Sequence, residues 1–201
     1  MGLLKKQRES IIGMILGDAY LQPTGKRNAR LRLEHSTKQK DYIFWKYELL
    51  KNFMQSKPKL YKRYNPRWKK EYYYYRCQTH SSPIFGRLRK RFYQNSRKTI
   101  PENIEVLLKS PLTLAIWVMD DGYLYKRDKH LFIYLPPYTE EEISRLREAL
   151  KKNFGLESKY GEKKKGKERF LWFDKRNTQH LIEIIKPHLI PSFKEKLLLT
   201  P

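Results

Sequence analysis

The sequence is poor in cysteine and has no long apolar run. Cys77 is its only cysteine, which excludes a disulfide framework and a cysteine-based zinc site and indicates a reducing compartment. No stretch approaches the roughly eighteen apolar residues of a membrane span, and the apolar run near Met1 is too short for a signal peptide. We therefore expect a soluble, intracellular protein with no membrane partner.

Acidic residues are scarce relative to basic ones. The 201 residues include 44 Lys and Arg against 21 Asp and Glu, a formal net charge of +23. Such an excess favours a polyanionic partner, because each cation that contacts a phosphate releases a condensed counterion. A disordered basic tail does not fit, since 39% hydrophobic and 14% aromatic residues supply the apolar surface for a core.

Histidines are few and scattered, which argues against a histidine-metal nuclease. None has a second His or Asn placed to complete a compact ligand cluster. We interpret them as surface or packing residues: His35, His80, His130, His180 and His188.

The first half of the chain alternates helical and strand patterns. An apolar segment at 9–21, with Ser10 as its N-cap, predicts a buried helix that carries Asp18 at its end. The strict alternation at 29–35 predicts a half-buried strand with Arg30, Arg32 and Glu34 on one face. Further expected elements are a helix at 38–54, strands at 59–64 and 71–78, and a helix at 82–95.

The same order of elements recurs in the second half. Expected are a helix at 112–123, a strand at 131–135, a helix at 139–154 that opens with a Thr139–Glu142 capping box, strands at 158–161 and 169–174, and a helix at 178–188. A shift of 103 residues lays Gly17-Asp18-Ala19-Tyr20-Leu21 over Asp120-Asp121-Gly122-Tyr123-Leu124. The repeat predicts two similar halves, residues 1–98 and 99–201.

Two nine-residue segments resemble the paired signatures of double-motif LAGLIDADG homing endonucleases. They are Ile11-Ile12-Gly13-Met14-Ile15-Leu16-Gly17-Asp18-Ala19 and Leu114-Ala115-Ile116-Trp117-Val118-Met119-Asp120-Asp121-Gly122. The resemblance extends to Lys98-Thr99-Ile100-Pro101 and to Lys186-Pro187-His188-Leu189-Ile190-Pro191, and so covers nearly the whole chain.

The resemblance implies a mixed α+β fold. Two pseudo-symmetric αββαββα halves would surround a central pair of motif helices, and a saddle of antiparallel strands would lie on double-stranded DNA. It also implies the function of a monomeric, intron-encoded endonuclease that makes metal-dependent double-strand breaks in a long asymmetric target. The host compartment would be a bacterial cytoplasm, a mitochondrion or a chloroplast.

Small residues in the motif segments agree with closely packed helices. Gly13 and Gly17 are four residues apart, and together with Ala115 they would let a second backbone approach. The second segment departs from the family pattern at Ile116 and Trp117, which are larger than expected. These two residues put the tightness of the crossing in question.

Paired helix ends would bring Asp18 and Asp121 together as the principal metal ligands. Two adjacent carboxylates repel each other unless a divalent cation lies between them, and Mg²⁺, with Mn²⁺ as a substitute, suits oxygen ligands. Such ions assist phosphodiester hydrolysis. Gly17 and Asp120 are weaker candidates at the same site.

The resemblance further implies a basic residue near each metal site, at Lys98 and Lys196. Each could polarise the attacking water or stabilise developing negative charge. A solvated surface lysine is the alternative interpretation for both.

The strands are expected to contact DNA, because a two-stranded ribbon fits the major groove and about half of such contacts go to the backbone. The candidates in the first half are Arg30, Arg32, Glu34, Tyr61, Arg63, Tyr73, Tyr75, Arg76 and Gln78. Those in the second half are Lys126, Tyr134, Lys159, Lys163, Lys164, Lys165, Arg169 and Trp172.

Two other functions stay open. A splicing cofactor that binds intron RNA would use the same basic surface, and a DNA-binding regulator could reuse the scaffold. Neither needs paired carboxylates, and the chain retains both Asp18 and Asp121. That retention favours cleavage.

Overall fold

The computed structural model describes residues 2–163, 166 and 168–197. Contacts divide the chain into two compact units, each with its own sheet. We call residues 18–90 the first unit, and residues up to 17 together with those from 91 onwards the second unit. The described part contains no helix that is long and apolar enough to cross a membrane.

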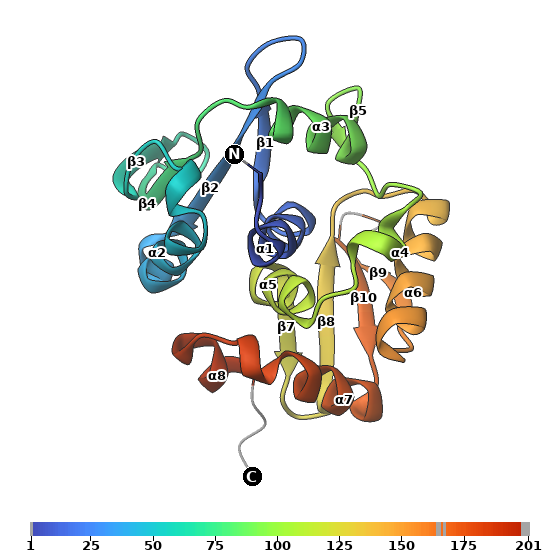
Figure 1. Ribbon diagram of the computed structural model, residues 1–201. Coiled ribbons are helices and arrows are strands. Elements are labelled where there is room, and N and C mark those ends of the chain that lie inside the picture. The colour runs from blue at the N-terminus through green and yellow to red at the C-terminus, as the bar shows by residue number, and fades with distance from the viewer. Residues whose placement is uncertain (1, 164–165, 167, 198–201) are drawn as a thin grey trace. The chain divides into compact units, whose positions relative to one another are not determined.

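The first unit is built on a four-stranded antiparallel sheet of order β1-β2-β4-β3. Helix α2 packs against β2 and β4 and covers one face of this sheet (Figure 1). The elements are β1 (Tyr20–Pro23), β2 (Ala29–Ser36), the 3-10 turn Thr37–Gln39, α2 (Lys40–Leu49), the 3-10 turn Lys51–Phe53, β3 (Lys59–Asn65) and β4 (Lys70–Gln78). Helix α3 (Pro83–Phe92) follows and runs into the second unit.

The second unit repeats this topology with a sheet of order β7-β8-β10-β9. Helices α5 and α7 contact this sheet. The elements are α1 (Lys5–Leu16), β5 (Tyr93–Gln94), β6 (Arg97–Lys98), α4 (Ile104–Leu107), α5 (Pro111–Asp121), β7 (Gly122–Tyr125), β8 (His130–Leu135), α6 (Glu140–Phe154), β9 (Lys159–Lys163), β10 (Glu168–Phe173), α7 (Lys175–Ile185), the 3-10 turn Lys186–His188 and α8 (Pro191–Leu197).

The common strand order bears out the internal repeat and the mixed α+β class. In the chain, each sheet follows an apolar helix and has a further helix between its second and third strands, α2 in one unit and α6 in the other. The division of the repeat at residues 98 and 99 stays a prediction, since the compact units divide elsewhere along the chain.

Helices α1 and α5 pack directly against each other within the second unit (Figure 1). Gly13 lies at the crossing, where a Cβ would come within 2.6 Å of the Thr113 carbonyl oxygen and 2.9 Å of Ile116 Cβ. The Thr113 hydroxyl donates to the Glu9 carbonyl at 2.9 Å and ties the two helices together. The large Ile116 is therefore accommodated because its partner on α1 is a glycine.

Three local expectations were wrong. Ser10 is not an N-cap: α1 begins at Lys5, and the buried Ser10 hydroxyl donates to the Lys6 carbonyl inside the helix. Instead, the Gln7 side chain accepts the Leu4 N–H. Both motif helices also end earlier than expected. The last residues of the expected helices at 9–21 and 112–123 belong instead to the short strands β1 and β7.

The start of α6 is as expected. Thr139 Oγ1 accepts the Glu142 N–H at 3.2 Å, and the Glu142 carboxylate accepts the Thr139 N–H at 2.7 Å. This reciprocal pair satisfies two backbone donors that the first turn leaves open. It also places the Glu142 carboxylate at the beginning of the helix.

We expect Gly13→Ala to lower the free energy of unfolding by about 1–3 kcal/mol, although alanine is the better helix former, because the added methyl overpacks the crossing. Urea unfolding followed by circular dichroism measures the change. Gly2→Ala is the control, since a Cβ at Gly2 meets nothing within 4 Å. Equal stability of Gly13→Ala and the unmodified protein would contradict the close crossing.

Candidate metal centre and nucleic-acid interface

The C-terminal ends of α1 and α5 bring backbone and carboxylate oxygens together in the second unit. Helix α5 ends at Asp121, and α1 is followed by Gly17. A Cβ at Gly17 would collide with the Asp120 carboxylate. The glycine is thus required for the approach of Asp120, and both aspartates are partly exposed.

This arrangement concentrates negative potential in a chain that is otherwise strongly basic. Each helix end carries unpaired carbonyl groups and the negative pole of the helix dipole, and Asp120 and Asp121 add two carboxylates to the end of α5. Lys98 offsets part of this negative potential, because its Nζ donates to the Gly17 carbonyl at 2.7 Å. An all-oxygen donor set of this kind fits a hard divalent cation.

Asp18 is the first residue of the first unit and is joined to Gly17 by a peptide bond. Its carboxylate side chain is 49% exposed. One carboxylate oxygen lies 4.0 Å from Nδ1 of His35, which is almost completely buried on β2. The peptide bond keeps Asp18 adjacent to the oxygen-rich end of α1.

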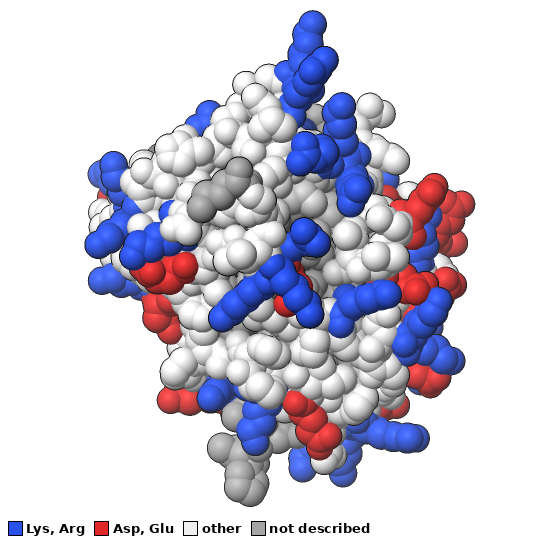
Figure 2. Space-filling model, in the orientation of Figure 1, with Lys and Arg blue, Asp and Glu red and all other residues white. Residues whose placement is uncertain are grey.

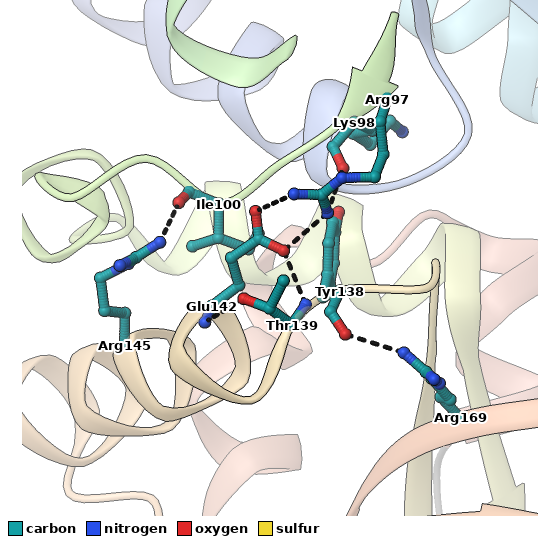
Figure 3. A network of polar contacts seen from close by, with 8 residues as sticks. All are labelled: Arg97, Lys98, Ile100, Tyr138, Thr139, Glu142, Arg145 and Arg169. Carbon is teal, nitrogen blue, oxygen red and sulfur yellow. Dashed lines mark hydrogen bonds and ion pairs between the residues drawn. The ribbon is translucent and has the colours of Figure 1, made fainter. Parts of the chain in front are cut away.

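A partly buried ion pair fixes the strand that carries Lys98 (Figure 3). Arg97 donates to both carboxylate oxygens of Glu142, at 2.8 and 3.0 Å. Glu142 is only 3% exposed and also caps α6. Strand β6 is thereby anchored to the start of α6, and Arg145 secures the next segment by donating to the Ile100 carbonyl at 3.0 Å.

Two titratable groups in this network, Glu142 and Tyr138, have shifted pKa values. Burial opposes ionisation of Glu142, but the hydrogen bonds from Arg97 and from the Thr139 N–H outweigh it and hold the pKa of that carboxyl below its usual 4.5. Tyr138 lies in the same network (Figure 3), where burial and then the Asp121 carboxylate raise the pKa of its phenol. Glu142 is therefore ionised, and Tyr138 is neutral, at ordinary pH.

Lys196 lies on the exposed side of α8. Its Nζ is 4.8 Å from the ring centroid of Phe193 on the same helix. The buried Phe193 thus supports the lysine stem. Its assignment to a metal site stays a prediction.

The register of the first sheet separates its candidate DNA contacts into two faces. On β2, Leu31, Leu33 and His35 are buried while the intervening residues are partly exposed. Cross-strand pairs place seven of the candidates on this open face: Arg30, Arg32, Glu34, Tyr61, Arg63, Arg76 and Gln78.

Tyr73 and Tyr75 lie on the opposite face, with the side chains that face α2. Tyr75 packs edge-on against Phe44 of α2. In their place the register puts Tyr72 and Tyr74 on the open face, and strict alternation from Arg76 along the strand would have found them.

Charged and aromatic groups interlock on the open face of the first sheet. Glu34 accepts hydrogen bonds from Arg76 at 2.7 Å and from Arg63 at 3.3 Å. Both guanidinium groups lie about 5 Å from the ring of Tyr74. The arginines are thus held in place before any ligand arrives.

The second sheet presents a more aromatic surface. Its register puts Tyr134, Lys159, Lys163 and Trp172 on one face, where the Lys159 and Lys163 ammonium groups lie over aromatic rings. Arg169 lies on the other face, where it donates to the Tyr138 carbonyl at 2.8 Å. Lys126 is exposed in the turn after β7. Lys164 and Lys165 lie outside the described residues.

Basic side chains spread over the surface in Figure 2, whereas carboxylates gather in fewer places. One of these places is the exposed start of α6, where Glu140 and Glu141 follow the Thr139 cap. Carboxylates at a helix N-terminus interact favourably with the helix dipole. This acidic cluster is therefore explained by helix stability.

A family model matches most of the chain and shows the protein family to which it belongs. The model described as the LAGLIDADG DNA endonuclease family matches residues 8–181. The chain belongs to this family. The earlier resemblance and the mixed α+β fold are thereby confirmed, and as a family member the chain is a DNA endonuclease.

Two LAGLIDADG relatives support this assignment over nearly the whole chain. The probable intron-encoded endonuclease 1 of Wickerhamomyces canadensis is 30% identical over 203 residues, which are 98% of this chain and 85% of that protein. The solved structure of the homing endonuclease I-WcaI bound to its DNA recognition sequence has a TM-score of 0.90 and 26% identity, and covers 100% of this chain and 89% of that one. A more distant structure of this fold, 16% identical with a TM-score of 0.52, was solved with its target DNA in the presence of Mg.

Other proteins that the chain matches carry different names. The cytochrome b mRNA maturase bI2 of Debaryomyces hansenii is 27% identical over 197 residues, 96% of this chain and 74% of that protein. The chain also matches proteins named RecA, of which it spans about half, for example 47%.

We expect Glu142→Gln to lower the free energy of unfolding of this LAGLIDADG protein by about 2 kcal/mol at pH 7, because Arg97 loses its carboxylate partner. The figure allows for the partial exposure of Arg97. Because folding lowers the pKa of Glu142, the stabilisation is complete above the unfolded value near 4.5 and is lost as the pH falls below it.

Urea unfolding at pH 7, 5 and 3.5 measures this difference. It should be constant between pH 7 and 5 and shrink at pH 3.5. Glu148→Gln, at an exposed position on the same helix, is the control. A difference that grows on acidification would contradict the assigned role of the ion pair.

Proposed function

We propose that this chain is a site-specific homing endonuclease that makes divalent-metal-dependent double-strand breaks in a long, asymmetric DNA target. The oxygen-rich end of α1 and α5 carries the proposal, because Asp121, Asp120 and the Gly17 carbonyl lie at neighbouring helix ends and Asp18 follows Gly17 directly. A regulator has no evident use for such a concentration of carboxylates, which lowers stability unless a cation compensates it.

The proposed metal ligands are Asp18 and Asp121, with the Gly17 carbonyl and Asp120 as further oxygen donors. Mg²⁺ fits this donor set and Mn²⁺ can substitute for it. Bound there, the ion would polarise the scissile phosphate and activate a water molecule for attack. The side chains contribute its placement and the surrounding charge.

Lys98 is the proposed group that stabilises negative charge at the phosphate. Its ammonium is held at the Gly17 carbonyl by a hydrogen bond, and the Arg97–Glu142 pair fixes its strand. Preorganised charge of this kind stabilises a transition state without reorganisation. Lys196 is proposed for the corresponding role in the other half of the repeat.

The open faces of the two sheets are the proposed DNA-binding surfaces. One presents arginine, glutamine and tyrosine, and the other presents lysine and aromatic rings. Because the faces differ, one monomer would read a target without symmetry. We propose that the protein acts inside the cell, in the bacterial cytoplasm, mitochondrion or chloroplast whose DNA carries the intron.

A second candidate function is intron RNA splicing. The match to a protein named as an mRNA maturase favours it, and a surface with a net charge of +23 suits structured RNA. Both activities can reside in one chain. One variant that loses splicing but keeps DNA cleavage, and another that loses cleavage but keeps splicing, would show that the two activities use different side chains.

We expect Asp18→Asn and Asp121→Asn each to abolish double-strand cleavage, because each removes a charged metal ligand. A library of randomised duplex targets is incubated with each protein in Mg²⁺ and in EDTA, and the cut sites are sequenced. The unmodified protein should cut one recoverable long site only with metal. Asp128→Asn, at an exposed turn, is the control. DNA binding without cleavage in any divalent ion would overturn the enzymatic proposal.

We expect Arg32→Ala to weaken binding of the recovered site by about 1–3 kcal/mol and to relax base preference at one position. Arg32 lies on the open face between Gln22 and Gln78, to which it donates at 2.6 and 3.5 Å. Fluorescence anisotropy in EDTA measures the affinity for variant targets. Lys62→Ala, an exposed position on the opposite face, should leave base preference unchanged. Unaltered preference in Arg32→Ala would contradict a direct base contact.

A further inference from the structure

Arg76 on β4 is held by several groups of the first unit at once. Its Nε donates to the Glu34 carboxylate at 2.7 Å, and its Nη2 donates to the Tyr74 hydroxyl at 2.9 Å. Its guanidinium carbon lies 4.9 Å from the ring centroid of Tyr61 and 5.3 Å from that of Tyr74. An arginine loses much rotamer freedom when it is fixed, and here that loss occurs on folding rather than on binding of a ligand.

These contacts occupy one edge of the Arg76 guanidinium and leave another edge open. The occupied edge carries Nε–H and one hydrogen of Nη2. The end of the group carries the other hydrogen of Nη2 beside the hydrogens of Nη1. Among the described residues, no group accepts a hydrogen bond from Nη1, and protein does not enclose this nitrogen. The end of the guanidinium therefore offers two parallel donors on the open face of the sheet.

Two parallel donors distinguish between the base edges of duplex DNA. In the major groove guanine presents two adjacent acceptors, O6 and N7, and a bidentate arginine binds both. The other bases present at most one acceptor beside a donor or a methyl group. A phosphate also accepts two hydrogen bonds, but the Glu34 carboxylate beside Arg76 lowers the attraction for an anion. The open edge is therefore best suited to guanine.

Glu34 and Tyr74 orient this edge from two sides. DNA phosphates repel a carboxylate, so Glu34 needs another role on a face that binds DNA. Its oxygens accept from Arg76 and, at 3.3 Å, from Arg63. The Tyr74 ring stacks on that of Tyr61, with centroids 5.9 Å apart, and this contact restrains the ring that carries the hydroxyl. Both acceptors of Arg76 are thus themselves held in place.

The second unit has aromatic rings at the corresponding place. The motif repeat and the cross-strand pairs put Tyr134 and Phe170 where the first unit has Glu34 and Arg76. The two rings pack edge-on with centroids 6.2 Å apart and offer no pair of parallel donors. The arrangement around Arg76 therefore serves one half of the repeat.

We propose that Arg76 determines specificity for one guanine in the half of the target that the first unit binds, with Glu34 and Tyr74 as its positioning residues. The end of its guanidinium donates to guanine O6 and N7 in the major groove. The inference rests on the proposed function, in which the open face of the first sheet binds duplex DNA. It assigns a base to that surface and a role to the carboxylate and the hydroxyl beside the arginine.

The test measures binding of the full chain to the recovered target in EDTA, so that no strand is cut. Each guanine of the target is replaced in turn by 7-deazaguanine, which still pairs with cytosine but has a C–H group in place of N7. One replacement should weaken binding of the unmodified protein by about fivefold or more. Arg76→Ala should be insensitive to that replacement. Arg76→Lys, which keeps the charge without the paired donors, should also be insensitive to it.

Two further variants test the positioning roles. Tyr74→Phe keeps the ring and removes the hydroxyl, and Glu34→Gln keeps the shape and removes the charge. Each should lower the preference for that guanine by about twofold to tenfold and leave binding to an unrelated duplex unchanged, which a loss of stability would not do. Lys59→Ala is the control, because Lys59 is exposed and lies opposite Arg76 on β3. It should weaken binding to all duplexes alike.

The outcomes separate this inference from the proposed function. If Arg76→Ala and the unmodified protein respond equally to every 7-deazaguanine, the role of Arg76 is overturned even where Asp18→Asn is inactive. An unchanged guanine preference in Tyr74→Phe and Glu34→Gln would overturn their positioning roles. Failure of the unmodified protein to bind any duplex would overturn the proposed function, and this inference with it.

Discussion

The close crossing of α1 and α5 at Gly13 is the contact on which the candidate site depends. Without a side chain at Gly13, the Thr113 carbonyl and the Ile116 side chain can approach the α1 backbone. The crossing sets the distance between the helices, and so the ends of the helices fall together at Gly17 and Asp120. Asp120, Asp121 and the Gly17 carbonyl take their positions from this crossing.

The site then accumulates an electrostatic cost that folding alone does not explain. Helix C-termini attract cations, yet α5 ends in two consecutive aspartates. Lys98 supplies a fixed cation in the second unit through its hydrogen bond to the Gly17 carbonyl, and its strand is held by a separate ion pair between Arg97 and Glu142. On the proposed function, the carboxylates lower stability because they must stay available for a metal, and fixed cations such as Lys98 offset part of this loss.

Much of this organisation could be predicted from the sequence because it follows simple periods. Alternation along β2 placed Arg30, Arg32 and Glu34 on one face, and the repeat of the motif predicted two sheets of one topology. The short strands after the motif helices were missed because aromatic and apolar residues continue the helical pattern into β1 and β7. Tyr73 and Tyr75 were named with Arg76 as candidate DNA contacts, although strict alternation from Arg76 puts Tyr72 and Tyr74 on its face of the strand.

Lys46 marks the limit of sequence-based inference. On an amphipathic helix a lysine is counted with the polar face, and nothing in the sequence of α2 distinguishes Lys46 from Lys40. Its burial depends on His35, which comes from another element and lies on the covered face of β2. Polar groups that meet only in the folded state have no local signature. The two halves of the repeat therefore share a topology that can be predicted from their sequence, whereas the buried contact between Lys46 and His35 in the first unit could not be predicted.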